Sequence, residues 1–174
     1  MSQFDACMTF TLEQEGGYSD TPGDSGGATN FGITQSTLAS WRGHVVSAAD
    51  VQALSSGEAG QIYKARYWDV VKGDSLPPGV DLMVFDFGVN AGPGASAKVL
   101  QICLEIDADG QIGPITLAAV AADDPHLLIG LLGVAQNNFY QHVVDQNVTD
   151  VQFLKGWLGR TERRITLAQQ MAGT

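Results

Sequence analysis

The sequence predicts a mainly α-helical, α+β fold with about eight helices and one small β-hairpin or glycine-rich loop after the first helix. Three observations lead to this class. Apolar residues recur at the three- and four-residue spacing of amphipathic helices over most of the chain. Clusters of glycine and proline separate these segments. Residues 16–33 are instead rich in glycine and small polar side chains, as in a loop or an irregular hairpin.

Capping residues and helix breakers place the individual helices. Ser55, with Glu58 three residues later, predicts a capping box, and Asp124 before Pro125 predicts an N-cap followed by proline in the first turn. The predicted helices cover residues 3–15, a short segment after Thr34 through Trp41, another after Ser47 through Leu54, and residues 57–71, 80–91, 95–106, 114–122, 125–145 and 150–171. The clearest break, Gly92-Pro93-Gly94, predicts two regions, residues 1–93 and 94–174.

Composition excludes several classes of function. Hydrophobic residues make up 44% of the 174 residues and charged residues 16%, which is typical of a globular protein. The net charge of −10 argues against binding to nucleic acid or to an anionic membrane surface. No apolar run reaches the roughly 18–20 residues that span a bilayer, so we expect no stable membrane insertion.

Neither the cysteines nor the histidines form a recognisable site. Cys7 and Cys103 lie in apolar helical patterns, and we expect two buried free thiols rather than a disulfide. Three scattered histidines show no metal-ligand or catalytic-triad spacing. We therefore expect no metal and no organic cofactor.

Glu15 stands at the end of the first predicted helix, directly before the glycine-rich segment and its further carboxylates. Glycoside hydrolysis requires one carboxylic acid that protonates the leaving oxygen and a second polar group that holds a water or steadies positive charge at the sugar. Burial and the negative end of a helix dipole both disfavour an ionised carboxyl. We expect Glu15 to keep its proton, and an Asp in the open loop to be ionised. The alternative is a tight turn with merely solvated carboxylates.

Several motifs in order resemble glycoside hydrolase family 108, the peptidoglycan muramidases of phage endolysins and secretion-associated lysozymes. They are Glu15-Gly-Gly-Tyr18, Asp24-Ser-Gly-Gly-Ala-Thr29, Gly32-Ile-Thr34, the aromatic segment 62–69 and the D-x-x-V-N-x-G-P segment ending at Pro93. The resemblance implies a lysozyme-like fold, with Glu15 as general acid and with Asp24 and Thr29 positioning the attacking water. Asp24 follows Glu15 after eight intervening residues, as in phage-type lysozymes, but Thr29 follows after four, one fewer than in that pattern. Asn30 could share the role of Thr29, and Asp20 competes with Asp24.

Other residues are candidates for sugar binding. Tyr18 belongs to the motif, and Tyr67 and Trp68 end a predicted helix; we expect one of these last two rings to face the core and the other the cleft. The amide of Asn90 suits a sugar N-acetyl group, although it could cap its helix. Asp86, on an otherwise apolar helix, requires a partner, for which Arg66 is a candidate; we interpret this pair as structural.

The second half resembles the peptidoglycan-binding region that follows this catalytic domain. Asp109-Gly110-Gln-Ile-Gly113-Pro114-Ile-Thr116 matches its D-G-x-x-G-P-x-T turn, and Gly156-Trp157-Leu-Gly-Arg160 matches its G-W-x-x-R segment. The alternative is that these helices only complete the fold. Lys155, Arg160, Arg163 and Arg164 predict a positive face on the last helix.

Together, the residues and the resemblance predict an N-acetylmuramidase that hydrolyses the β-1,4 bond between N-acetylmuramic acid and N-acetylglucosamine. A lytic transglycosylase acting on the same substrate and a non-catalytic cell-wall-binding protein are the alternatives. The first ten residues lack the features of a secretory signal. We therefore expect synthesis in the cytoplasm without a signal peptide, and action on the periplasmic cell wall after release by a partner such as a holin or an export system.

Overall fold

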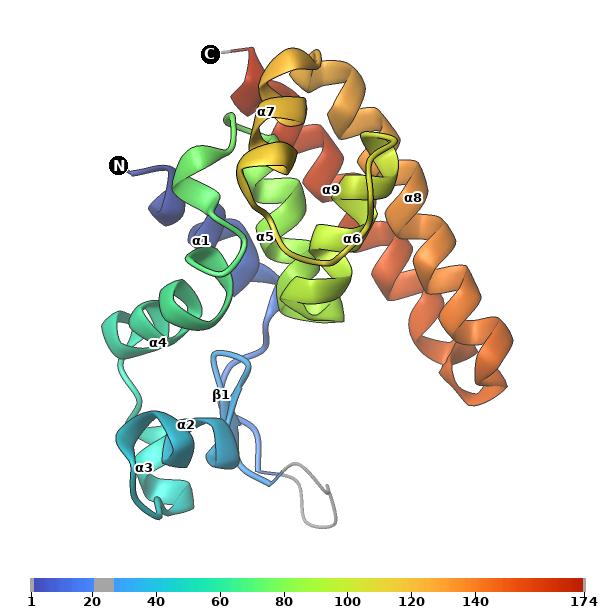
Figure 1. The fold of residues 1–174 in the computed structure, drawn as a ribbon. Helices are drawn as coiled ribbons and strands as arrows, with labels where there is room; N and C mark the ends of the chain where they lie inside the picture. Colours follow the sequence, from blue (N-terminus) through green and yellow to red (C-terminus); the bar gives the residue numbers. More distant parts are fainter. Residues whose placement is uncertain (1, 21–26, 174) are drawn as a thin grey trace. The chain divides into compact units, whose positions relative to one another are not determined.

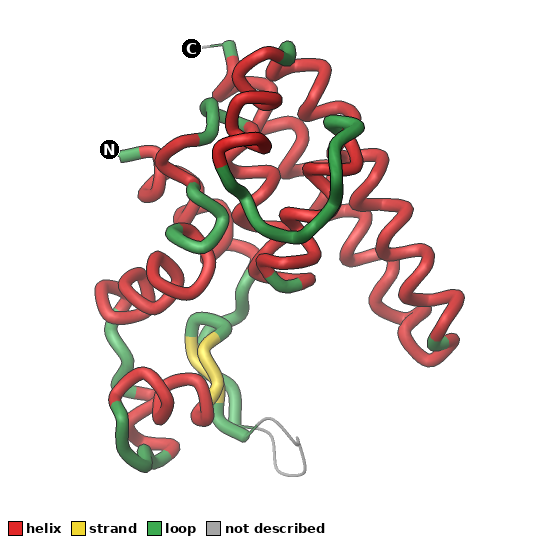
Figure 2. Tube along the Cα trace, viewed as in Figure 1, coloured by secondary structure: helices red, strands yellow, loops and turns green. Residues whose placement is uncertain are grey.

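The computed structural model describes residues 2–20 and 27–173 and is mainly helical. Within these residues it has nine α-helices and one two-stranded antiparallel sheet, which confirms the predicted fold class (Figures 1 and 2). The helices are α1 Gln3–Gln14, α2 Gln35–Arg42, α3 Ala48–Gln52, α4 Ser56–Tyr63, α5 Val80–Ala91, α6 Pro93–Cys103, α7 Pro114–Ala122, α8 Pro125–Gln146 and α9 Val151–Ala172. The strands are β1 Thr29–Asn30 and β2 Ile33–Thr34. A π-helix, η1 Lys64–Trp68, and two 3-10 helices, η2 Gly73–Ser75 and η3 Val148–Asp150, complete the elements.

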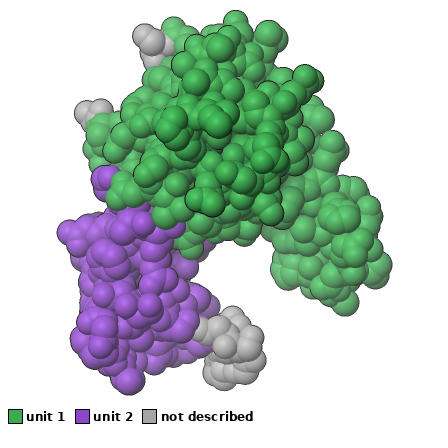
Figure 3. Space-filling view, viewed as in Figure 1, with its two compact units in different colours: residues 1–7, 67–174 green, residues 8–66 purple. Residues whose placement is uncertain are grey.

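The chain forms two compact units (Figure 3). Unit 1 comprises Met1–Cys7 and Tyr67–Thr174, and unit 2 comprises Met8–Arg66. These units are defined by how compactly the chain packs, and they do not test the domain boundary predicted between residues 93 and 94. That boundary stays a prediction.

Side-chain caps begin the helices of unit 2, although not all as predicted. Ser47 and Asp50 form a reciprocal capping box at α3. At α4, Ser55 accepts a hydrogen bond from the backbone N–H of Glu58, but the Glu58 carboxylate binds the Arg42 guanidinium at 2.7 and 2.9 Å. The predicted capping box is therefore only half formed, because a distant arginine competes for its carboxylate. The helix predicted over 57–71 also changes character, since α4 ends at Tyr63 and continues as the π-helix η1.

Helix α5 forms the centre of unit 1. Its residues from Val80 to Gly88 are all buried, as expected for a helix that is apolar on every side. Helices α6, α8 and α9 lie around it (Figure 1). The rings of Phe4, Trp68 and Phe85 meet edge to face with centroids 5.4 to 6.0 Å apart. Apolar packing around α5 therefore holds unit 1 together.

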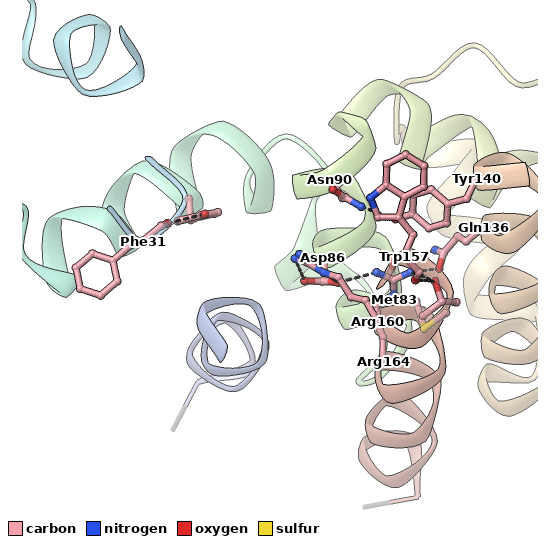
Figure 4. Close-up of polar contacts among 11 residues, drawn as sticks. Phe31, Met83, Asp86, Asn90, Gln136, Tyr140, Trp157, Arg160 and Arg164 are labelled. Atoms are coloured by element: carbon pink, nitrogen blue, oxygen red, sulfur yellow. Dashed lines mark hydrogen bonds and ion pairs between the residues drawn. The ribbon is translucent and has the colours of Figure 1, made fainter. Parts of the chain in front are cut away.

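One buried charge cluster crosses this core (Figure 4). Asp86 accepts two hydrogen bonds from Arg160, at 2.7 and 3.0 Å, and one from Arg164 at 2.6 Å. Burial opposes ionisation of Asp86, but the Arg160 hydrogen bonds and the Arg164 charge outweigh it and hold the pKa of this carboxyl below its usual value. The prediction that Asp86 requires a partner is confirmed, but the candidate Arg66 is wrong: Asp86 pairs with Arg160 and Arg164, whereas Arg66 donates to Ser40 Oγ at 3.0 Å.

The positive face predicted on α9 is wrong for two of its four residues, because Asp86 binds them in the core. The Arg164 side chain is fully buried and the Arg160 side chain is only 11% exposed, and both are paired with Asp86. Asp86 balances one of the two charges, and neither arginine supplies an exposed cation to that face.

The turn before α7 is organised by Gln101. Its Oε1 accepts from the Gly110 backbone N–H at 2.8 Å, and its Nε2 donates to Asp109 Oδ1 at 2.7 Å. Gly110 has φ +81° and lies close to Lys98, so the turn requires glycine there.

The remaining sequence predictions concern the thiols and the membrane. Cys7 and Cys103 are free thiols, the first buried and the second half-buried. Among the described residues no single helix is long and apolar enough to cross a membrane, and the pair α7–α8, which reaches that length and hydropathy together, is bent by 116° at its break.

Candidate active site

A two-residue hairpin turn forms the base of the site in unit 2. Strands β1 and β2 pair through Asn30 and Ile33, leaving Phe31 and Gly32 as the turn. Their φ angles are +51° and +72°, and a type I′ hairpin turn requires positive φ at both positions. The Tyr63 hydroxyl, at the end of α4, donates to the Phe31 carbonyl at 2.9 Å. This bond holds the turn against α4.

Glu15 lies directly after α1, with its side chain against this turn. Its backbone N–H donates to Thr11 O at 3.1 Å, which continues the helix ladder by one residue. The side chain is half-buried. A methyl group at Gly32 would lie 2.7 Å from Glu15 Oε2 and 2.6 Å from Tyr63 Oη, both shorter than real contacts. The Glu15 carboxyl and the Tyr63 hydroxyl therefore converge on the backbone of Gly32, where only a glycine leaves room.

The segment after Glu15 runs beside the hairpin. Ser19 exchanges two backbone hydrogen bonds with Thr29, at 2.8 and 2.9 Å, which adds a bridge to the edge of β1. Thr29 is half-buried, and Tyr18 is 39% exposed with its hydroxyl donating to Asp20 Oδ2 at 3.3 Å. Partial desolvation and the neighbouring Asp20 raise the pKa of Tyr18. Asp24 lies outside the described residues.

Asn30 does not present its side chain to a sugar, which corrects its prediction as a substrate-binding residue. It is buried, and its Nδ2 donates to the carbonyls of Val51 and Gln52, both at 3.1 Å. These carbonyls lie at the C-terminal end of α3, so Asn30 holds α3 against the hairpin.

Of the two rings in η1, one was predicted to face the core and the other the cleft, and the structure confirms the first part. Trp68 is fully buried, and its indole N–H donates to Asp74 Oδ1 at 2.9 Å. Its ring is therefore unavailable to a sugar, which removes it from the predicted substrate-binding residues. Tyr67 is half-buried, and its role stays a prediction.

Asn90, in unit 1, is exposed near the end of α5 and donates from Nδ2 to Tyr140 Oη at 2.8 Å. Its amide therefore binds the Tyr140 side chain on α8 rather than a carbonyl at the end of its own helix. Its predicted part in sugar binding is open to test.

Two contributors to the site were not singled out from the sequence. Gly32 and Tyr63 stand in matched motifs, but the role of each depends on the place of the Glu15 carboxyl, which only the folded chain defines. Within the described part of the chain, no group of three or more His, Cys, Asp or Glu side chains is arranged to hold a metal ion.

Taken together, the described residues of unit 2 present a half-buried carboxyl, Glu15, beside the Tyr63 hydroxyl and the hairpin turn. A carboxyl in such surroundings can donate a proton to a leaving oxygen.

Comparisons with known proteins agree with this chemistry. The family model described as Glycosyl hydrolase 108 matches residues 8–92, and the model described as Predicted Peptidoglycan domain matches residues 96–162. Among the solved structures that match, one described as "Structure of Brucella abortus SagA" is 40% identical, with a TM-score of 0.85, and the match covers 98% of this chain and 96% of that one. No curated protein sequence matches the chain. The chain therefore belongs to glycosyl hydrolase family 108 and is a glycoside hydrolase that acts on peptidoglycan.

Proposed function

We propose that the chain is an N-acetylmuramidase that hydrolyses the β-1,4 bond between N-acetylmuramic acid and N-acetylglucosamine, with Glu15 as general acid. The half-buried Glu15 carboxyl, held against Gly32 and Tyr63, is the observation that carries this proposal. The type of bond follows from the resemblance to the muramidases of the family.

In the proposed reaction Glu15 gives its proton to the bridging oxygen as the bond from that oxygen to the anomeric carbon breaks. A water molecule supplies the hydroxyl that replaces the leaving sugar, and its proton passes to a carboxylate. We assign the positioning of this water to Asp24 and Thr29. The products are a reducing-end N-acetylmuramic acid and a free hydroxyl on N-acetylglucosamine.

The decisive variant is Glu15→Gln, which keeps the shape of the side chain but removes the transferable proton. Loss of a general acid typically reduces the rate about 10²- to 10⁴-fold, so clearing of a peptidoglycan suspension should fall by at least about 100-fold. Glu13→Gln is the matched control, because Glu13 is an exposed residue near the end of α1, two positions before Glu15. Circular dichroism verifies that both variants fold. Equal clearing by the two variants would refute the role of Glu15.

Mass spectrometry of the digested peptidoglycan tests the reaction itself. A reducing-end muramic acid, one water heavier than an anhydro end, supports hydrolysis. An anhydro end would assign the chain to the lytic transglycosylases, and no cleavage by the native protein would leave only a cell-wall-binding role.

Peptidoglycan lies outside the inner membrane, so an enzyme made in the cytoplasm must reach the periplasm to cut it. We propose a holin or an export system as the route. Expression in a Gram-negative host with and without a holin separates the two routes: lysis only with the holin supports a holin, and equal lysis without one supports an export system. No lysis in either culture, with the protein present in the cytoplasm and active on purified peptidoglycan, would contradict both.

A further inference from the structure

Unit 1 carries a stack of three aromatic rings that ends at the surface. Tyr140 is buried at the base and stacks on Trp157 with ring centroids 5.1 Å apart and planes 23° apart (Figure 4). Phe153, four residues before Trp157 on α9, lies 5.9 Å from it and is 51% exposed. Trp157 itself is half-buried. The outer part of the stack therefore presents aromatic surface to solvent.

Polar atoms lie at the edge of these rings. Asn90 is exposed and commits its Nδ2 to Tyr140 Oη, which leaves its Oδ1 as an acceptor. The indole N–H of Trp157 has no hydrogen-bond partner among the described residues and is not among their buried unpaired polar atoms, so it is open to solvent. One donor and one acceptor thus stand beside the exposed rings.

The charged side chain next to the stack, Arg160, is bound to the buried Asp86. Arg160 lies three residues after Trp157, its side chain is only 11% exposed, and it donates from Nε and Nη2 to the Asp86 carboxylate at 3.0 and 2.7 Å. An anion at the rings would therefore have to compete with Asp86 for this guanidinium. A protein partner with an apolar face would cover the rings but would leave the Trp157 N–H and the Asn90 amide without partners, which is costly on burial.

An N-acetylated sugar satisfies all three features. The C–H face of a pyranose ring packs on aromatic rings, and an acetamido group offers one N–H donor and one C=O acceptor. We propose that Phe153, Trp157 and Asn90 form a glycan-binding platform for N-acetylated sugars, with Tyr140 as a positioning residue. The class of ligand rests on the proposed function, but the platform is tested separately because it is a matter of binding and not of cleavage.

The test uses the full chain carrying Glu15→Gln, so that the ligand stays intact. Binding of N-acetylglucosamine tetramer is followed by tryptophan fluorescence and calorimetry, and binding to purified sacculi by sedimentation. Phe153→Ala and Trp157→Phe should each weaken tetramer binding about 3- to 10-fold, the range of one aromatic contact or hydrogen bond. Leu131→Ala is the matched control, since Leu131 is also 51% exposed and lies in unit 1 on α8.

A second readout isolates the polar part of the platform. Glucose tetramer lacks acetamido groups, so the parent should prefer the N-acetylated tetramer, and Asn90→Ala should reduce that preference while keeping most of the binding to the glucose tetramer. A merely structural role for Asn90 would weaken both ligands equally.

Two results would overturn the platform. The first is unchanged affinity for the N-acetylglucosamine tetramer in both Phe153→Ala and Trp157→Phe, whatever activity Glu15→Gln retains. The second is a change of oligomeric state in the ring variants, seen by sedimentation velocity, with sugar affinity unaltered, which would identify a protein interface. Conversely, retained clearing activity in Glu15→Gln would refute the muramidase proposal without touching the platform.

Discussion

Replacing Gly32 by alanine tests whether the placement of the Glu15 carboxyl matters for cleavage. The new Cβ would lie 2.7 Å from Glu15 Oε2, whereas ordinary contacts begin at 3.4 Å, so the carboxyl must move by about 0.7 Å. A misplacement of about 1 Å at a reacting group can cost about 100-fold in rate. We therefore expect kcat to fall about 10- to 100-fold.

Gly43→Ala separates this effect from backbone strain. Gly43 has φ +75°, close to the +72° of Gly32, but nothing lies within 4 Å of its added carbon. Both variants therefore share the cost of about 1–2 kcal/mol for an L-residue in the left-handed region. Urea unfolding measures this shared cost, and loss of turbidity of a peptidoglycan suspension measures activity. If the two variants clear peptidoglycan at the same rate, the position of the Glu15 carboxyl does not control the chemistry.

Three further predictions concern stability and the turn. Asp86→Asn should destabilise the protein by about 3–5 kcal/mol, because it leaves the fully buried Arg164 charge uncompensated. Glu58→Gln, at the more exposed Arg42 pair, should cost less than about 1 kcal/mol. Urea unfolding followed by fluorescence compares the two variants, and equal losses of stability would contradict the reasoning. Burial raises the pKa of Asp81 to about 6, above its value near 4 in the unfolded chain, so its contribution to stability is complete below pH about 4 and is lost as the pH rises through 6. Asp81→Asn keeps an Oδ1 acceptor but cannot ionise. The variant should therefore be more stable than the native protein by about 3 kcal/mol at pH 8 and should lose this advantage at pH 4 in the same assay. A stability difference that does not vary with pH would contradict this prediction. Tyr63→Phe removes the hydrogen bond to the Phe31 carbonyl and should lower both stability, by about 1 kcal/mol, and clearing activity; unchanged activity would show that the hydroxyl does not position the turn.

Elements whose limits are encoded locally were predicted well. Helices α5 and α7 begin and end at the predicted residues, and Asp124 caps α8 as expected. Glycine, proline and capping side chains act on neighbouring backbone groups, so a short window of sequence contains the whole signal. The capping box at Ser55 was misjudged because its carboxylate found a partner sixteen residues away, in Arg42.

The sequence by itself determined the helical class, most helix limits and the motif that carries Glu15, because periodicity, caps and motif spacing are properties of neighbouring residues. Only the tertiary structure decided that Trp68 is buried, that Asn30 anchors α3, and that Asp86 pairs with arginines 74 and 78 residues further along the chain. Each of these outcomes depends on which distant surface a side chain meets. A polar or aromatic residue looks the same in the sequence whether it faces a sugar or satisfies a buried group, and packing alone separates the two.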